Sequence, residues 1–397
     1  MNKALEGIKV LDLSRYIAGP ACTMMMAELG AEIIKVEIPN GGDAMRHLWP
    51  LTEGGESYVG VILNRGKKSI TLNLRSDEGK EIIKKLVKEA DILVENFATG
   101  VMERLDLSFE NLRKINPSLI YASITGFGHT GPDSKRIAYD MLAQARGGIM
   151  SVTGYKDGPP IKAAPAIADY LGAVHALIAI LAALRYRDAT GKGQSIDLSL
   201  LDGIWLLTAI EHCGYYFLYG KAFERLGNEA LSNSPSGCYP TKDGWVVMNI
   251  TTDDEWARLS RAMHREEVIT DPKYRTIPLR VNNRDEVNAI VSKWTGELTM
   301  EEVEKELMTA KVACSRVATF DQVPNDPQLL SRNMVVEVEQ KLSGKMKVPG
   351  SVFKMSETSG NATVAAPFVG ENNTEIYCGR LEYSEKELKE MKDKGII

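Results

Sequence analysis

Short apolar runs alternate with helical patterns along the first two hundred residues of the chain, and this alternation is the strongest constraint on its fold. Residues 8–14, 32–38 and 92–97 are short, mainly apolar runs. Between them lie 21–31 and 77–90, whose apolar residues have helical spacing. Strands that alternate with helices form βαβ units, in which the strands pair in parallel. The sequence therefore predicts an α/β fold with a parallel sheet.

The same alternation continues through the middle of the chain. Residues 119–125 and 194–200 have the pattern of further strands. Helical patterns cover 137–150 and 168–186, and another apolar helix begins near Leu201. We therefore expect the parallel sheet to gain at least two more strands from this part of the chain.

The composition changes after this region, which indicates a second unit. Residues 225–244 are rich in Gly, Ser, Asn and Pro, as is typical of a linker or an exposed crossing segment. A strand pattern over 245–251 and charged helical patterns within 284–311 then predict a smaller α+β domain. Further on, two alternating runs predict a hairpin that turns at Ser343 and Gly344.

Charge and cysteine content exclude several classes of function. The net charge of −5 comes without a basic block, so nucleic acid is not an expected partner. Five cysteines at irregular spacing predict neither a disulfide framework nor a zinc site, and no metal is expected. The first residues have no apolar core of signal-peptide length, so we expect a cytoplasmic protein. The apolar stretch 171–184 is shorter than the ~20 residues of a membrane span, which predicts a core helix and no membrane association.

A glycine motif after one predicted strand gives the first candidate site. Gly126, Gly128 and Gly131 form G-x-G-x-x-G, which would suggest a dinucleotide such as NAD. However, Pro132 and the polar residues after it do not open a regular helix, and no acidic residue follows at the distance that a ribose contact needs. A structural turn is the favoured interpretation, and NAD binding stays as the alternative. The sequence contains no GxSxG elbow, no phosphate-binding P-loop and no metal-type histidine spacing.

Two strand ends are further candidates, because open α/β sheets bind ligands there. The first predicted strand ends at Ser14 and leads into a helix through small residues, Ala18 among them, which would let a ligand approach the backbone. Another ends at Asn96 and Phe97 and is followed by Arg104, which would place an amide, an aromatic face and a guanidinium beside a nucleotide. An ordinary turn and a capped loop remain the alternatives.

Asp169 lies near the start of the long apolar helix. Its simplest role is that of an N-cap that accepts hydrogen bonds from the first free amides. A carboxylate held in this way is expected to stay ionised, and the same amides could stabilise an oxyanion that forms when it attacks a carbonyl. Capping and catalysis are therefore compatible.

Taken together, these segments resemble the class III CoA-transferase family, also called CaiB/BaiF, which shares its fold with formyl-CoA transferase and α-methylacyl-CoA racemase. The resemblance is carried, in order, by GIKVLDLSRYIAGP, LGAEIIKVE, GGDAMR, SITLNLRSDEGK, LVENFATGVMERL, SITGFGHTGP, IADYLGAVHALIAILAAL, GKGQSIDLSLLDG, DGWVV and MVVEV. These motifs span nearly the whole chain and are specific for the fold.

The resemblance implies a homodimer of two interlocked rings. Each chain would have a large Rossmann-like domain, built from both chain ends, and a smaller α+β domain. The implied bounds are 1–200 for the first part of the large domain, 201–225 for a helix and linker, 226–325 for the small domain, and 326–397 for a return segment that completes the large domain.

Carried over from the family, the site consists of one nucleophile and a set of coenzyme A contacts. The nucleophilic aspartate maps onto Asp169. The CoA contacts map onto Tyr16, Ile17, Ala18, Leu72, Arg75, Asn96, Phe97, Arg104 and Tyr139. Ile38 stands where some members have an arginine for the nucleotide end, and Ile17 replaces a polar residue of the oxalate-using enzymes. CoA is expected as a substrate, and no tightly bound cofactor is implied.

The implied reaction moves CoA from an acyl-CoA to a carboxylic acid through a mixed anhydride and an aspartyl-CoA thioester. The alternative is an α-methylacyl-CoA racemase, whose histidine would fall at position 139, where this chain has Tyr139. A phenol with a pKa near 10 is a poor proton shuttle at neutral pH, which favours the transferase. The segment after the DGWVV strand, NITTDDEW, has no glycine run, which disfavours exchange between formyl-CoA and oxalate. The segment HCGYYFLYG is a candidate lining for a larger acid.

Overall fold

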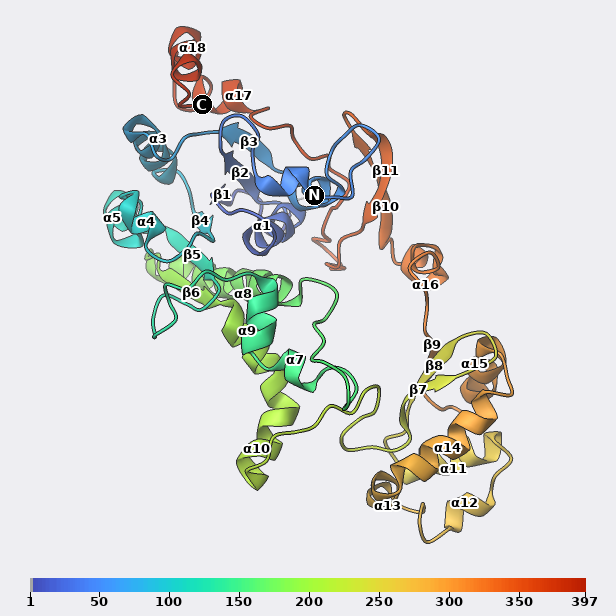
Figure 1. Cartoon of the computed structure of the whole chain (residues 1–397). Helices are drawn as coiled ribbons and strands as arrows, with labels where there is room; N and C mark the ends of the chain where they lie inside the picture. Colours follow the sequence, from blue (N-terminus) through green and yellow to red (C-terminus); the bar gives the residue numbers. More distant parts are fainter. Residues whose placement is uncertain (1–2) are drawn as a thin grey trace. The chain divides into compact units, whose positions relative to one another are not determined.

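The main sheet of the protein is fully parallel. In the computed structural model, which describes residues 3–397, six strands pair in the order β3-β2-β1-β4-β5-β6 (Figure 1). They are β1 (Lys9–Asp12), β2 (Glu32–Glu37), β3 (Lys68–Thr71), β4 (Ile92–Glu95), β5 (Ile120–Thr125) and β6 (Ser195–Ser199). The parallel register confirms the predicted α/β fold. The strand order reverses between β1 and β4, which is the place where such sheets bind ligands.

Helices cover both faces of this sheet because its strands send successive side chains to opposite sides. In β1, Val10 enters the hydrophobic core beneath α1 (Ala18–Glu28) and α8 (Ile167–Thr190). Leu11 enters the core beneath α3 (Asp77–Val87). The second core also includes residues of α5 (Phe109–Ile115), α17 (Asn373–Tyr377) and α18 (Glu385–Asp393). The C-terminal helices therefore complete the same layer as α3 (Figure 1).

The helix α8 is the longest of the described helices and, among residues 3–397, the one with the length and composition of a membrane span. Ala173, Ala176 and Ile180 on one of its sides are fully buried in the core shared with α1. This packing agrees with the prediction of a core helix. Its other side leaves Val174 and Ile178 exposed.

The chain divides into two compact units. The first contains Met1–Ile149, Lys162–Phe217 and Pro327–Ile397, and so includes both chain ends. The second contains Met150–Ile161 and Leu218–Asp326. The segment 201–225, predicted as a helix and linker, is helical as far as Tyr219, in α9 (Leu200–Thr208), a π-helical turn η2 (Ala209–Cys213) and α10 (Gly214–Tyr219).

The second unit has a three-stranded antiparallel sheet of β7 (Ser236–Pro240), β8 (Trp245–Asn249) and β9 (Cys314–Arg316). Its helices are α11 (Asp253–Ala262), α12 (Glu267–Thr270), α13 (Ile277–Asn282), α14 (Arg284–Thr295) and α15 (Met300–Thr309). Buried Trp256, Leu259 and Val291 belong to a separate hydrophobic core between this sheet and its helices.

The predicted hairpin is also present, as β10 (Val335–Gln340) and β11 (Gly344–Pro349). Gly344 has φ +62°, a left-handed conformation that glycine adopts without steric cost. The remaining short elements are η1 (Ala44–His47), α2 (Tyr58–Asn64), α4 (Val101–Arg104), α6 (Asp140–Arg146), α7 (Ile149–Val152), η3 (Val323–Asn325) and α16 (Pro327–Ser331).

Candidate functional site

A pocket of about 290 Å³ lies at the carboxyl ends of β1, β4 and β5, beside the reversal of strand order. This volume is at the small end of the range for ligand sites, ~300 Å³ and above. Of the residues predicted from the sequence, those that line the pocket are Tyr16, Ile17, Ala18, Asn96, Phe97, Tyr139 and Asp169. They come from four separate parts of the chain, which the fold of the first unit brings together.

Three other predicted residues do not line this pocket. Leu72 follows β3 and is 1% exposed in the second core. Arg75 and Arg104 are exposed on the surface. Ile38, which stands in place of an arginine, is also exposed, beyond the end of β2.

Asp169 is not the N-cap of α8, and that prediction is wrong. The cap position belongs to Ala166, and Asp169 is the third residue of the helix. The first amides are instead bound by Asp140 at the start of α6. Its Oδ1 accepts from the backbone N–H of Ala168 at 2.7 Å and of Asp169 at 3.3 Å. Asp140, distant in sequence, thus caps α8 in place of a local side chain. The Asp169 carboxylate faces the pocket.

The ionisation of Asp169 also differs from expectation. Burial, and then the negative charge of Asp140, raise the pKa of Asp169 to about 7. The carboxyl group is therefore only partly ionised at neutral pH, and the amides expected to stabilise its charge are bound to Asp140 instead. A carboxyl group with this pKa is a good proton donor and a poised nucleophile near neutral pH, which is common at functional sites.

Two tyrosines line the same pocket as this carboxylate. The rings of Tyr16 and Tyr139 meet edge to face, with centroids 6.3 Å apart. Tyr16 has φ +61°, which is rare for a residue with a bulky side chain. Both rings are more than one third exposed, at 43% and 60%, so they are free to contact a bound molecule.

Two arginines line the pocket that the sequence analysis did not include. The guanidinium of Arg15 lies 5.1 Å from the ring centroid of Phe97, and no carboxylate within residues 3–397 is at ion-pair distance from it. Arg136 pairs with Asp133 at 3.1 Å on an exposed surface. The signal for Arg15 was its place directly after the first predicted strand end. The signal for Arg136 was weaker, because it lies in a loop without a regular pattern.

Asn96 bonds to the protein as well as lining the pocket. Its Oδ1 accepts from the Arg15 N–H at 2.8 Å, and its Nδ2 donates to the Arg15 carbonyl at 2.7 Å. This side chain joins the loops that follow β1 and β4. Next to it, burial raises the pKa of Glu95 to about 7, and the Glu95 Oε2 accepts from the Phe97 N–H at 2.8 Å.

The glycine motif forms a turn and does not open a helix. A Cβ atom on Gly126 would lie 1.9 Å from the Cβ of Ala138, so the two loop segments require glycine there. Gly128 and Gly131 have φ +78° and +84°. The next helix, α6, begins at Asp140. The geometry therefore agrees with the structural turn and lacks the helix N-terminus that a dinucleotide fingerprint needs.

Comparison with known proteins identifies the family. The model of CoA-transferase family III matches residues 5–373. The succinyl-CoA–D-citramalate CoA-transferase of Chloroflexus aurantiacus is 34% identical, over 100% of this chain and 98% of that protein. The succinyl-CoA:mesaconate CoA-transferase of Haloarcula marismortui is 37% identical, over 94% and 95%. The human succinyl-CoA:glutarate CoA-transferase is 35% identical, over 100% and 90%.

A solved structure agrees with these relatives. A CAIB/BAIF family protein from Brucella suis superposes with a TM-score of 0.85 at 34% identity, over 96% of this chain and all of that one. The resemblance noted in the sequence is thereby confirmed, and the substrates of the family, CoA thioesters and carboxylic acids, suit a pocket that holds a carboxylate and two guanidiniums. The chain belongs to CoA-transferase family III and is a CoA transferase of this class.

Proposed function

We propose that this enzyme moves CoA from an acyl-CoA donor to a carboxylic acid, with Asp169 as the covalent nucleophile. The observation that carries the proposal is the position of the Asp169 carboxylate in the pocket at the reversal of strand order. Its raised pKa, about 7, supports this role because a more basic carboxylate is a stronger nucleophile once it is ionised.

The reaction would proceed through two kinds of acyl-enzyme. The Asp169 carboxylate attacks the thioester carbonyl, forms a mixed anhydride, and releases CoA as a thiolate. The thiolate then attacks the aspartyl carbonyl, which gives an aspartyl-CoA thioester and releases the donor acid. The acceptor carboxylate attacks this thioester, and the released thiolate takes the acceptor acyl group from the second anhydride. Asp169 is regenerated as a carboxylate, and every step is an acyl transfer that needs no oxidant or reductant.

The positive charges of the pocket support binding of CoA phosphates. Arg15 supplies a guanidinium that no carboxylate within residues 3–397 neutralises, and Arg136 supplies a second. We propose that these two guanidiniums bind CoA phosphates in place of the arginine that some family members have at position 38, where this chain has Ile38. Exposed Arg75 and Arg104 then remain proposed contacts for the part of CoA that extends beyond the pocket.

For the acids, we propose succinyl-CoA or a similar short acyl-CoA as donor and a small dicarboxylic acid as acceptor. The three curated relatives named above are succinyl-CoA transferases that act with citramalate, mesaconate or glutarate. A second carboxylate on the acid would find a guanidinium partner in the pocket. The segment 212–220, considered for a larger acid, does not contribute to the walls of this pocket.

The racemase alternative lacks its histidine base at this site. Tyr139 occupies the position where the racemase histidine would lie, and none of the residues that line the described pocket is a histidine. Exchange of deuterium at the α-carbon of a branched acyl-CoA would favour the racemase. Thermal stabilisation by NAD without stabilisation by CoA would favour the oxidoreductase.

The proposed homodimer is supported by an exposed apolar surface of the first unit. Ile178 of α8, Trp205 and Leu206 of α9, Ile210 of η2 and Phe217 of α10 are between 51% and 76% exposed. Side chains of this kind are usually covered by another protein surface. Light scattering after gel filtration should give twice the chain mass of 43.8 kDa, and a mass of one chain would contradict the dimer.

Trapping of the aspartyl intermediate tests the mechanism directly. The enzyme is incubated with succinyl-CoA and hydroxylamine, digested, and the peptide with Asp169 is weighed by mass spectrometry. Hydroxylamine converts the anhydride or thioester into a hydroxamate, so that peptide should gain the corresponding mass, and the peptide with Asp140 provides the internal control. An unmodified Asp169 peptide, in a sample that binds CoA and turns over succinyl-CoA, would contradict covalent catalysis by this residue.

A further inference from the structure

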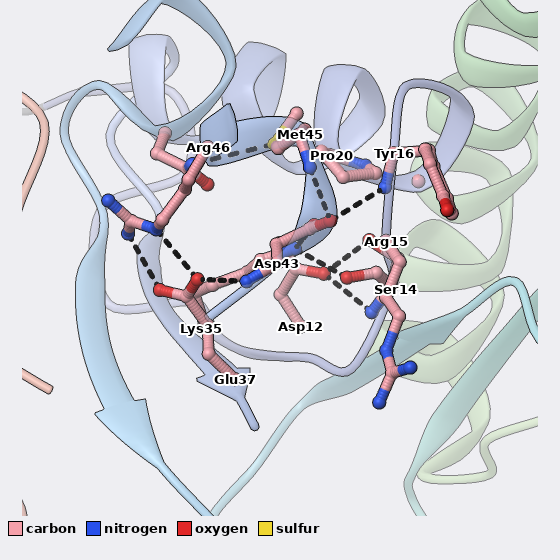
Figure 2. A network of polar contacts seen from close by, with 12 residues as sticks. Asp12, Ser14, Arg15, Tyr16, Pro20, Lys35, Glu37, Asp43, Met45 and Arg46 are labelled. Carbon is pink, nitrogen blue, oxygen red and sulfur yellow. Dashed lines mark hydrogen bonds and ion pairs between the residues drawn. The ribbon is translucent and has the colours of Figure 1, made fainter. Parts of the chain in front are cut away.

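A buried network of charged side chains lies beneath the loop that lines the pocket after β1. Figure 2 shows Asp12, Lys35 and Asp43 in this network, together with the backbone of the loop from Ser14 to Tyr16. Lys67 completes it. All four charged side chains are at most 1% exposed. Burial of a charge costs free energy unless ion pairs and hydrogen bonds compensate it.

Every backbone polar group from the Ser14 N–H to the Tyr16 N–H is bound by a side chain of this region. The Asp12 carboxylate accepts from the Ser14 N–H at 2.9 Å, and the Lys35 ammonium donates to the Ser14 carbonyl. The Asn96 amide bonds to both backbone groups of Arg15. The Asp43 Oδ1 accepts from the Tyr16 N–H at 3.2 Å. The loop is thus determined by side-chain contacts at consecutive positions.

These contacts explain the unusual backbone of Tyr16. A non-glycine residue at φ +61° is strained, and such strain persists where the surrounding structure fixes the conformation. The Asp43 bond to the Tyr16 N–H and the Asn96 bond to the Arg15 carbonyl fix the peptide plane that precedes Tyr16. From this fixed plane the chain must turn into α1, which begins at Ala18, and Tyr16 makes that turn with a positive φ. This conformation presents Tyr16 and Ile17 to the pocket.

Asp43 is itself fixed from two sides. Its Oδ2 pairs with the Lys35 ammonium at 3.0 Å, and its Oδ1 also accepts from the Met45 N–H, which caps η1. On the other side, Arg46 of η1 binds Glu37 at the end of β2 through both Nε and Nη2, and its Nη1 donates to the Pro367 carbonyl. The position of Asp43 therefore depends on β2 and on the returning C-terminal segment.

We infer that Asp43 is a positioning residue for acyl-CoA: held by Lys35 and η1, it fixes the peptide plane that precedes Tyr16 and so sets the shape of the pocket wall that meets CoA. The inference rests on the proposed binding of CoA in this pocket. Asp43 is buried and does not line the pocket, so its effect on the substrate passes through the loop.

Binding of free CoA, measured by calorimetry, tests this role in three variants. In Asp43→Asn an oxygen remains to accept from the Tyr16 N–H, but the charge that pairs with Lys35 and holds the side chain in place is lost. The Kd for CoA should rise about tenfold or more, as expected when a charge-assisted hydrogen bond is lost. In Asp43→Glu the charge that pairs with Lys35 is kept while the carboxylate is displaced from the Tyr16 N–H. It should also weaken CoA binding, with a smaller drop in melting temperature, and it serves if Asp43→Asn does not fold.

Glu28→Gln is the matched control. Glu28 forms another buried ion pair, with Arg65, in the same unit but away from the loop. Its loss should lower the melting temperature and leave the Kd for CoA unchanged. The KM for acyl-CoA should follow the Kd in the Asp43 variants, whereas the KM for the acid acceptor should change little. A general loss of folded enzyme would lower kcat and leave both KM values unchanged.

Hydrogen exchange of the peptide that covers residues 13–20 separates this inference from the proposed function. If the wild type fails to bind CoA, the proposed function is wrong, and faster exchange of this peptide in the Asp43 variants still supports the positioning role. If the wild type binds CoA and the folded Asp43 variants bind it equally well, or if their exchange in 13–20 is unchanged, the positioning role is overturned.

Discussion

Asp12 and Asp169 are two carboxylates of the first unit in opposite electrostatic surroundings. Asp12 ends β1 and is fully buried. Burial alone would raise its pKa, but Lys35, Lys67 and the hydroxyls of Ser14 and Thr23 outweigh that effect and hold the pKa of Asp12 well below its usual range. Its Oδ2 lies 3.0 Å from the Lys67 ammonium. Asp12 is therefore charged at neutral pH.

Asp169 is less buried but has no such compensation. No Lys or Arg within residues 3–397 is at ion-pair distance from its carboxylate, and the charge that acts on it is that of Asp140. Burial and this like charge raise its pKa to about 7. The difference shows that the charge partner, more than the depth of burial, decides whether a buried carboxylate has a lowered or a raised pKa.

The largest expected effect is on activity, in Asp169→Asn. An amide cannot form the anhydride, so kcat for CoA transfer should fall by at least about 10³-fold. Steady-state rates with succinyl-CoA and an acid acceptor measure this loss. Near-normal turnover in the purified variant would contradict the role of Asp169. The difference between Asp12 and Asp169 would then concern stability alone.

The same variant should be more stable than the wild type at alkaline pH. The folded pKa of Asp169, about 7, lies above its unfolded value of ~3.9, so the native state holds a proton that the unfolded chain releases, and stability falls as pH rises between these values. Asp169→Asn lacks this loss. The stability of the variant relative to the wild type should therefore be greater near pH 8.5 than near pH 5, by roughly 1 to 3 kcal/mol, which melting temperatures at the two pH values measure.

Asp12→Asn should lower the stability of the fold, whereas Asp169→Asn should raise it at alkaline pH. Removal of one partner of a buried ion pair leaves Lys67 without its counter-charge, which typically costs about 3–5 kcal/mol. Chemical denaturation at pH 7 measures this loss. The double variant Asp12→Asn, Lys67→Met is the control and should lose less than the two single variants together. A stable Asp12→Asn would break the comparison, because Asp12 would then not depend on its cations.

The sheet and its helices were predictable from the sequence because they depend on local periodicity. The run around Val10 and Leu11 and the helix of α3 each have a pattern that one short window reveals. The positions of Tyr16, Asn96 and Asp169 at one pocket followed from the rule that ligands bind at strand ends, together with the family resemblance.

What the sequence did not reveal depends on contacts between distant residues. Asp140 takes the amides of α8 from a different helix, and nothing in the local pattern around Asp169 indicates this. The sequence also gives no reason to expect that Asp43 binds the Tyr16 N–H. Both carboxylates lie in loops or at helix starts, where spacing carries little information about tertiary partners.

The smallest expected effect, and the sharpest test of the comparison, is a shift in the pH profile. If Asp169 must be ionised to attack, kcat/KM should fall with decreasing pH below about 7. Asp140→Asn removes the like charge that raises the pKa of Asp169 but keeps an oxygen to accept from the Ala168 N–H. Because burial is the larger cause of the raised pKa, the acid limb should move to lower pH by less than about one unit.

Glu95→Gln is the control for this profile, because burial also raises the pKa of Glu95 to about 7, beside the same pocket. Glu95 does not line the pocket, and its carboxylate binds the Phe97 N–H, so its neutral analogue should leave the acid limb where it is. A limb that disappears in Glu95→Gln and persists in Asp140→Asn would assign the ionisation to Glu95. The raised pKa of Asp169 would then have no consequence for the rate.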